Sequence, residues 1–207
     1  MFRTMASSSE TGPSWSDTMS RHTAMEPGLK HKLDYDDLAH TPNDQLIYEL
    51  AEGELHVAPS PNPRHQWISK RLQRQLEAYF EGRDIGRVYN APIDVVLTKH
   101  DVFVPDLVVV ADRSIITERA VEGPPLLVVE VLSPSTTQYD RTTKSRRYAT
   151  LGVEHFWIVD VDNQVLEIYR RSGERFVDIA RVRGGAAFDH PDFPELSIET
   201  ASLWSEP

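Results

Sequence analysis

Residues 126–132 constrain the fold most, because a single acidic residue stands inside an otherwise unbroken apolar run. A short run of this kind is typical of a central strand that is covered on both faces. Glu130 is therefore expected to be buried within a sheet. An ionised carboxylate is costly to bury alone, so such groups are paired, neutralised or bound to a metal ion. The partner of Glu130 is the main question that the sequence poses.

The composition narrows the classes of protein. The chain has 207 residues, which suits one domain with a substantial core. It has no cysteine, which excludes disulfides and thiolate chemistry and fits a reducing compartment, so we expect a cytoplasmic protein. Its net charge of -10 argues against broad, non-specific binding of nucleic acids. We see no apolar run long enough for a membrane span, and no secretory signal.

Residues 1–26 differ from the rest of the chain. They contain ten serines and threonines, all four methionines and no apolar periodicity. We expect a disordered leader over residues 1–26, followed by a single domain over residues 27–207. Met19 and Met25 are alternative starts for translation.

Periodicity and turn signals predict a mixed α/β domain, with a central sheet flanked by helices. We expect an N-terminal hairpin, two long helices and a C-terminal meander, with the tail packed on the body. The predicted elements are a helix over 32–40 capped by Asp34, a hairpin of 47–50 and 54–57 around Gly53, a helix over 64–80, strands over 87–90, 93–98, 102–110 and 126–132, a helix over 141–151 with Asp140 as its cap and Gly152 at its end, a strand over 155–161, and strands over 165–170 and 176–181.

A second acid lies in the preceding predicted strand. Strand alternation places Asp106 on one face of residues 102–110, and Glu130 on one face of its own strand. Two carboxylates on adjacent strands repel each other, and a shared divalent cation resolves that repulsion. Carboxylates together with water suit Mg²⁺ or Mn²⁺ and not Zn²⁺. The eight histidines show no metal-ligand spacing.

Lys144 supplies a positive charge near these acids. If Asp140 caps the helix, then Arg141, Lys144 and Tyr148 share one face. That face would turn toward the sheet, so the ammonium of Lys144 could reach the acids. An acid pair, a metal ion and a lysine are the parts needed to hydrolyse a phosphodiester.

Structural explanations remain open for each of these residues. Asp106 follows Pro105, and Pro-Asp is an ordinary pair at a strand start or a turn. Glu130 could instead form a buried ion pair with Lys144 or Arg141, and Lys144 could be a solvated surface residue.

At these motifs the chain resembles the Uma-type family of restriction-endonuclease-like proteins, which belongs to the PD-(D/E)XK nuclease superfamily. The resemblance covers about residues 32–204, and the run from Glu130 to Thr136 is its most specific part. The matching motifs are Tyr48-Glu49-Leu50, Gly53-Glu54-Leu55, Pro63-Arg64-His65-Gln66, Pro105-Asp106, Glu130-Val131-Leu132-Ser133-Pro134-Ser135-Thr136, Asp140, Lys144, Tyr148, Gly152-Val153 and Trp157.

The resemblance implies a restriction-endonuclease-like fold and metal-dependent cleavage of DNA. It implies Asp106 and Glu130 as ligands of Mg²⁺ or Mn²⁺, with the Val131 carbonyl as a third ligand. The superfamily's usual lysine position holds Leu132, and Lys144 on the following helix is the residue that matches the catalytic lysine.

Four further residues are candidates with simpler alternatives. Glu49 is a candidate catalytic acid, and its alternative is a charge at the hairpin edge. His65 could bind phosphate or transfer a proton, although a histidine at a helix start is often structural. Arg141 and Tyr148 are candidates for substrate binding.

Two basic segments offer surfaces for DNA. Residues 64–74 carry Arg64, Lys70, Arg71 and Arg74, and residues 141–147 carry Arg141, Lys144, Arg146 and Arg147. Each segment could meet phosphates, or could be an ordinary solvated helix face. The main alternative to a nuclease is a non-catalytic nucleic-acid-binding or regulatory module that retains the fold, and a purely structural partner domain is a third. A homodimer also stays open.

Overall fold

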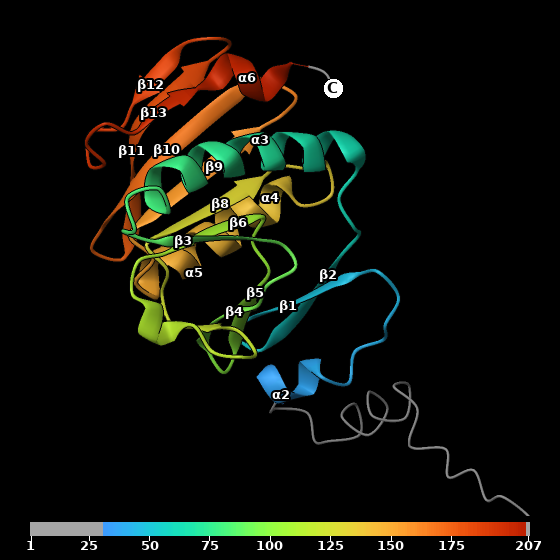
Figure 1. Cartoon of the computed structure of the whole chain (residues 1–207). Helices are drawn as coiled ribbons and strands as arrows, with labels where there is room; N and C mark the ends of the chain where they lie inside the picture. Colours follow the sequence, from blue (N-terminus) through green and yellow to red (C-terminus); the bar gives the residue numbers. More distant parts are fainter. Residues whose placement is uncertain (1–30, 206–207) are drawn as a thin grey trace, which may run out of the picture.

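The computed structural model describes residues 31–205, so the expected leader over 1–26 lies outside the described part of the chain. The chain forms two main sheets, the larger in the upper part of the view in Figure 1 and the smaller in the lower part, with helices around them. The larger sheet has the strand order β11-β10-β9-β8-β6-β3, and the smaller has the order β2-β1-β5-β4-β7. This architecture agrees with the predicted mixed α/β class, including the N-terminal hairpin and the C-terminal meander.

The larger sheet is built around β8, the apolar run that contains Glu130. β8 is fully buried, pairs in parallel with β9 and pairs antiparallel with β6, as a strand covered on both faces should. In this register Glu130 lies beside Ile158 of β9, and Leu107 of β6 lies beside Val129. The strands of this sheet are β3 (Arg87–Asn90), β6 (Leu107–Val110), β8 (Leu127–Val131), β9 (His155–Asp160), β10 (Val165–Ser172) and β11 (Arg175–Arg183).

The smaller sheet begins with the predicted hairpin. Gly53 turns the chain with φ +80, and a Cβ there would come within 2.6 Å of the Lys32 side chain, so glycine is required. The β4–β5 pair is also antiparallel and is joined by a short turn after Thr98. The strands of this sheet are β1 (Ile47–Ala51), β2 (Glu54–Ala58), β4 (Val95–Thr98), β5 (Asp101–Phe103) and β7 (Val121–Glu122).

The helices cover opposite faces of the larger sheet. Helix α3 (Pro63–Phe80) begins at its N-cap Asn62, and its apolar stripe packs on the side chains of Val129 and Val131. Tyr148 of α5 (Ser145–Thr150) packs on the other face with Val128. Figure 1 shows α3 on one side of β8, with α5 and the smaller sheet on the other.

Short elements complete the fold. The tail packs on the α3 side of the core through Phe193, Leu196 and partly buried Phe188 and Trp204, as the sequence predicted. Asp34 caps α2 and forms a reciprocal capping box with Asp37. The remaining elements are α2 (Tyr35–Leu38), a 3-10 turn (Arg113–Ile115), α4 (Thr137–Tyr139), a π-helical turn (Asp140–Lys144), β12 (Ala187–Asp189), β13 (Ser197–Glu199) and α6 (Thr200–Trp204).

The prediction of one strand over residues 102–110 is wrong. The chain leaves the smaller sheet after Phe103 and enters the larger sheet at Leu107, so Asp106 lies in the crossing segment just before β6. Pro105 lacks the N–H that a central strand needs, which accounts for a break at this point. Strand alternation therefore does not fix the direction of Asp106.

The prediction that Asp140 caps a helix over 141–151 is also wrong. The helical segment starts earlier, at Thr137, and Asp140 is the first residue, itself buried, of a π-helical turn inside it. The segment ends near Gly152 with φ +99, as expected. A helix both long and apolar enough to cross a membrane is absent from residues 31–205.

Candidate active site

Glu130 is buried near the C-terminal end of β8, and its carboxylate has two close partners. One oxygen, Oε1, accepts a hydrogen bond of 2.8 Å from the Tyr148 hydroxyl and lies 3.1 Å from the Lys144 ammonium. The exposed fraction of Glu130 is only 3%. Both partners come from the helical segment after β8, so the predicted approach of Lys144 and Tyr148 to the sheet is confirmed.

Lys144 is the centre of a cluster of buried acids. Its ammonium lies 2.8 Å from Glu49 Oε1 and 3.5 Å from Asp140 Oδ1, in addition to its contact with Glu130. Glu49 is held in turn by the backbone N–H of Val104, which donates to its carboxylate at 2.8 Å. The smaller sheet, the larger sheet and the helical segment thus each contribute one acid to the same ammonium.

The charges of this cluster do not balance. Glu49, Glu130 and Asp140 face the one ammonium of Lys144, so two negative charges are uncompensated when all three acids are ionised. Burial raises the pKa of Glu130 well above its usual value, and the neighbouring acids raise it further, against the lowering effect of Lys144. Burial likewise raises the pKa of Glu49 and of Asp140. The site therefore favours either bound protons or an additional cation.

The same acids keep Lys144 charged. Burial alone lowers the pKa of the Lys144 amine, but Glu130, Glu49 and Asp140 together raise it well above its usual range. An amine held this way is a permanent positive charge and not a general base at neutral pH.

Asp106 belongs to a second group, with His65 and the backbone of Val131. Its Oδ2 accepts a 2.7 Å hydrogen bond from the Val131 N–H and lies 3.3 Å from His65 Nε2. His65 Nε2 also lies 2.7 Å from the Val131 carbonyl oxygen. Burial lowers the pKa of His65, but Asp106 and the Val131 carbonyl oppose this, and the net pKa is raised. His65 is therefore part of the site and not a peripheral helix-start residue.

A single cavity of about 240 Å³ joins the two groups. Asp106, Glu130, Asp140 and Lys144 all line it. The negative charge of Asp106 also contributes to the raised pKa of Glu130, which places the two acids near each other in space. Further lining residues include Glu49, His65 and Val131, together with parts of the loops 58–62 and 133–136.

The donor set of this cavity fits a hard divalent cation. Asp106 and Glu130 offer carboxylate oxygens, Val131 offers a carbonyl, and Mg²⁺ commonly binds through one or two carboxylates with water completing its shell. Within residues 31–205, no three carboxylates of this cavity have oxygens all within 4.8 Å of one another.

The predicted basic face over residues 141–147 is not free. Arg141 is paired with Glu167 and Asp160, and Arg146 is paired with Glu52. Arg147 makes two contacts with Asp101, at 2.7 and 2.8 Å. Arg141 does not line the Glu130 cavity, and Tyr148 reaches Glu130 from inside the core, so neither presents itself to a ligand there.

The basic face of α3 is different. Arg64, Lys70 and Arg74 are exposed, and none of them has an ion-pair partner among the residues that the structure describes. Arg71 stacks on the Trp67 ring at 4.7 Å. A second cavity, of about 410 Å³, lies along this helix and is lined by Lys70 and also by Asp106.

Sequence reasoning missed two residues of the site. Asp140 was interpreted as a cap, although its spacing of four residues from Lys144 is the signal that the two side chains share a face. Tyr139 is the other, since its ring lies 5.7 Å from the Lys144 ammonium and stacks on His56 at 4.2 Å. No spacing rule pointed to Tyr139.

Comparison with solved structures identifies the class of fold. A crystal structure described as "a putative nuclease belonging to DUF820 from Anabaena variabilis" has a TM-score of 0.67, with coverage of 83% of this chain and 97% of that one. The two sequences are 21% identical, so the likeness concerns the fold. This chain therefore has a nuclease-like α/β fold, as predicted.

The family follows from the sequence. Residues 34–201 match the Uma2 family, described as "Putative restriction endonuclease", and the chain belongs to that family. The resemblance seen in the motifs is thereby confirmed. "Uncharacterized protein slr1290" of Synechocystis sp. is 26% identical over 129 residues, which cover 61% of this chain and 67% of that protein.

Proposed function

We propose that this protein is a metal-dependent endonuclease that hydrolyses phosphodiester bonds of DNA. The observation that carries the proposal is that Asp106, Glu130 and Lys144 line one cavity. Acids that bind a cation, beside a fixed positive charge, suit the activation of water next to a phosphate. The family's description and the nuclease-like fold support the same class of reaction.

The acids would hold the metal ion. Asp106, Glu130 and the Val131 carbonyl are the proposed ligands of Mg²⁺ or Mn²⁺. Such an ion polarises a phosphate and lowers the pKa of a bound water. The uncompensated negative charge of the cluster supports a divalent cation, because the ion would replace the protons that the raised pKa values otherwise favour.

Lys144 and His65 have separate roles in this proposal. The ammonium of Lys144, held by Glu49 and Asp140, neutralises charge that develops on the phosphate or orients the attacking water. His65 positions the ligands, because its Nε2 contacts both the Asp106 carboxylate and the Val131 carbonyl.

The substrate would approach along α3. Asp106 lines both the cavity of Glu130 and the cavity beside α3, so one strand of DNA could cross it from one to the other. Lys70, Arg64 and Arg74 would contact phosphates outside the reacting centre, which offsets the acidic balance of the whole chain.

A non-catalytic module that retains the nuclease fold is the second candidate. Leu132 occupies the superfamily's usual lysine position and packs in the apolar cluster of Tyr148 and Phe156. The amine of Lys144 is also tied to three acids before any substrate arrives. Both observations are compatible with a protein that binds nucleic acid and does not cut it.

A cleavage assay separates the two candidates. Purified full-length protein is incubated with plasmid, single-stranded and branched DNA in Mg²⁺ or Mn²⁺, beside Asp106→Asn and Glu130→Gln. We expect each variant to lose at least about 100-fold in rate, more than the usual cost of disturbing a metal's outer shell. Asp112→Asn, at an exposed acid, is the matched control and should cut normally.

Two outcomes oppose the proposal. Equal cleavage by the wild type, Asp106→Asn and Glu130→Gln would mean that a contaminant is responsible. DNA binding without cleavage in either metal would favour the non-catalytic module.

A further inference from the structure

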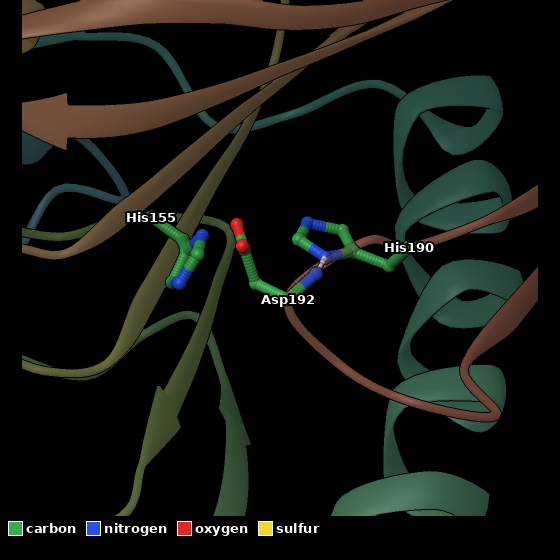
Figure 2. Close-up of side chains that lie close together, drawn as sticks. All are labelled: His155, His190 and Asp192. Atoms are coloured by element: carbon green, nitrogen blue, oxygen red, sulfur yellow. Dashed lines mark hydrogen bonds between the residues drawn. The ribbon is translucent and has the colours of Figure 1, made fainter.

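Two histidines and an aspartate converge far from the Glu130 cavity. His155 opens β9, and His190 and Asp192 lie in the loop between β12 and β13 (Figure 2). One ligand atom from each residue lies within 4.8 Å of the others. His155 pairs with Leu127 at the start of β8, whereas Glu130 lies near that strand's other end, so the two sites are distinct.

Polar atoms of this group are buried without partners. Nδ1 of His155, Nε2 of His190 and Oδ2 of Asp192 each lack a hydrogen-bond partner. The exposed fraction is 5% for His155 and 4% for His190. Buried polar atoms are normally satisfied, so three unsatisfied atoms in one such close group of side chains indicate a missing bound species.

The surroundings hold these side chains in place. The His190 ring stacks on Phe193, with ring centroids 4.4 Å apart, and on Trp157, with centroids 5.5 Å apart. The other oxygen of Asp192, Oδ1, accepts a 2.7 Å hydrogen bond from Arg170. The Asp192 side chain is 24% exposed, which leaves an approach from solvent.

The surroundings of both imidazoles disfavour their protonated forms. Burial lowers the pKa of His155, and burial together with the charge of His155 lowers the pKa of His190 to about 4. A neutral imidazole has a lone pair that can bind a metal ion. Two neutral imidazoles and one carboxylate are a donor set for Zn²⁺ with an open fourth position.

We propose that His155, His190 and Asp192 bind a zinc ion that fastens the loop between β12 and β13 to the start of β9. This site is separate from the proposed nuclease centre and does not depend on it. Ligands of a tetrahedral zinc lie about 3.3 Å apart, given bonds of about 2.0 Å. The three ligand atoms already lie within 4.8 Å of one another, so binding needs only a small movement of the side chains.

Binding requires one rearrangement at His190. Its Nδ1 accepts a 3.1 Å hydrogen bond from the Asp192 N–H, which leaves the proton on Nε2. Coordination through Nε2 moves this proton to Nδ1 and releases the Asp192 N–H. Coordination through Nδ1 displaces the same hydrogen bond. The amide of Asp192 therefore changes environment in either case.

The test is zinc binding by untagged full-length protein after treatment with a chelator. We expect isothermal titration calorimetry to show one zinc per chain in the wild type and in Glu130→Gln. At a hundredfold excess over Kd, zinc should raise Tm by roughly 5 to 10 °C. His190→Gln should abolish binding, and Asp192→Asn should weaken it at least tenfold. Co²⁺ in place of zinc should give the intense visible bands of a four-coordinate site.

The variants are chosen so that misfolding does not hide the answer. Asp192→Asn changes one oxygen of a partly exposed side chain and keeps Oδ1 for Arg170, so it should retain the wild-type circular dichroism spectrum. His40→Gln, at an exposed histidine, is the control and should bind zinc normally. Absence of zinc binding in the wild type would overturn the proposal. Zinc binding by Asp192→Asn and His190→Gln as tight as that of the wild type would overturn it too. Loss of zinc binding in Glu130→Gln would mean that zinc binds at the proposed nuclease centre, and this result would also overturn the proposal.

Discussion

The ammonium of Lys144 lies 2.8 Å from a carboxylate oxygen of Glu49, which the N-terminal hairpin contributes. The same ammonium lies 3.1 Å from Glu130 on the central strand. One buried cation therefore joins the two sheets. Breaking a buried pair by removing one partner is strongly destabilising, because the remaining charge loses its compensation.

Lys144→Met is expected to destabilise the protein by about 3–5 kcal/mol, since it leaves three buried acids without a cation. Urea unfolding at neutral pH measures the loss. Lys70→Met, the same change at an exposed lysine of α3, should stay within about 0.5 kcal/mol of the wild type. Added Mg²⁺ or Mn²⁺ should restore part of the stability of Lys144→Met, because the ion supplies the missing positive charge. Similar unfolding curves for the two variants would contradict this account of the cluster.

Glu130→Gln should change the pH dependence of stability. The raised pKa of Glu130 means that the folded protein binds this proton more tightly than the unfolded chain. The contribution of Glu130 to the free energy of unfolding is complete below its pKa in the unfolded chain, about 4.5. This contribution is lost as pH rises through the pKa of Glu130 in the folded protein. A glutamine does not titrate, so Glu130→Gln should gain stability relative to the wild type as pH rises above about 4.5. Urea unfolding across this range tests the trend, with the same substitution at an exposed glutamate, Glu118→Gln, as the matched control.

Local patterns of the sequence were enough to predict most elements. The 3.6-residue period predicted α3 to within one residue, and the apolar run predicted β8, because both signals depend on neighbouring positions only. The prediction of one strand over residues 102–110 failed because both apolar halves of this run are buried, but in different sheets. Pro105 was the local signal of a break, and it was outweighed by the length of the apolar run.

Local patterns likewise pointed to some residues of the candidate site and not to others. Glu130, Asp106 and Lys144 stand out because each places a charge in or beside an apolar element. The inward turn of Asp140 depends on a π-helical turn that no short pattern encodes. The His155, His190 and Asp192 group was missed because its members are distant in the chain, and only the folding of the tail onto β9 brings them together.

His65 should titrate above the usual histidine range. Its contacts with Asp106 and the Val131 carbonyl raise the pKa, whereas burial lowers the pKa of His56 and that of His155. NMR titration of the ring protons should therefore place His65 above about 6.5 and the other two below it.

The same pKa shift sets the sign of a stability effect. His65 should contribute its full stabilisation below pH of about 6.5, and this contribution should be lost as pH rises through its raised pKa. The stability difference between the wild type and His65→Gln should accordingly shrink toward alkaline pH. A difference that grows with pH would mean that His65 is neutral in the folded protein and that its link to Asp106 is weaker than the geometry indicates.

The salt dependence of DNA binding should identify α3 as the surface that meets phosphates. Lys70 and Arg74 are exposed and have no ion-pair partner among the residues seen in the structure, whereas Arg146 is paired with Glu52. The slope of log K against log salt is negative, and each lost phosphate contact reduces its magnitude by about 0.9. The double variant Lys70→Gln with Arg74→Gln should therefore reduce this magnitude by about 2. Arg146→Gln also removes an exposed charge but should leave the slope nearly unchanged, because that arginine is already paired with Glu52. Fluorescence anisotropy at several salt concentrations, with Asp106→Asn in every protein to prevent cleavage, gives the slopes. An effect of Arg146→Gln larger than that of the Lys70 and Arg74 variant would mean that DNA binds on the opposite side of the larger sheet.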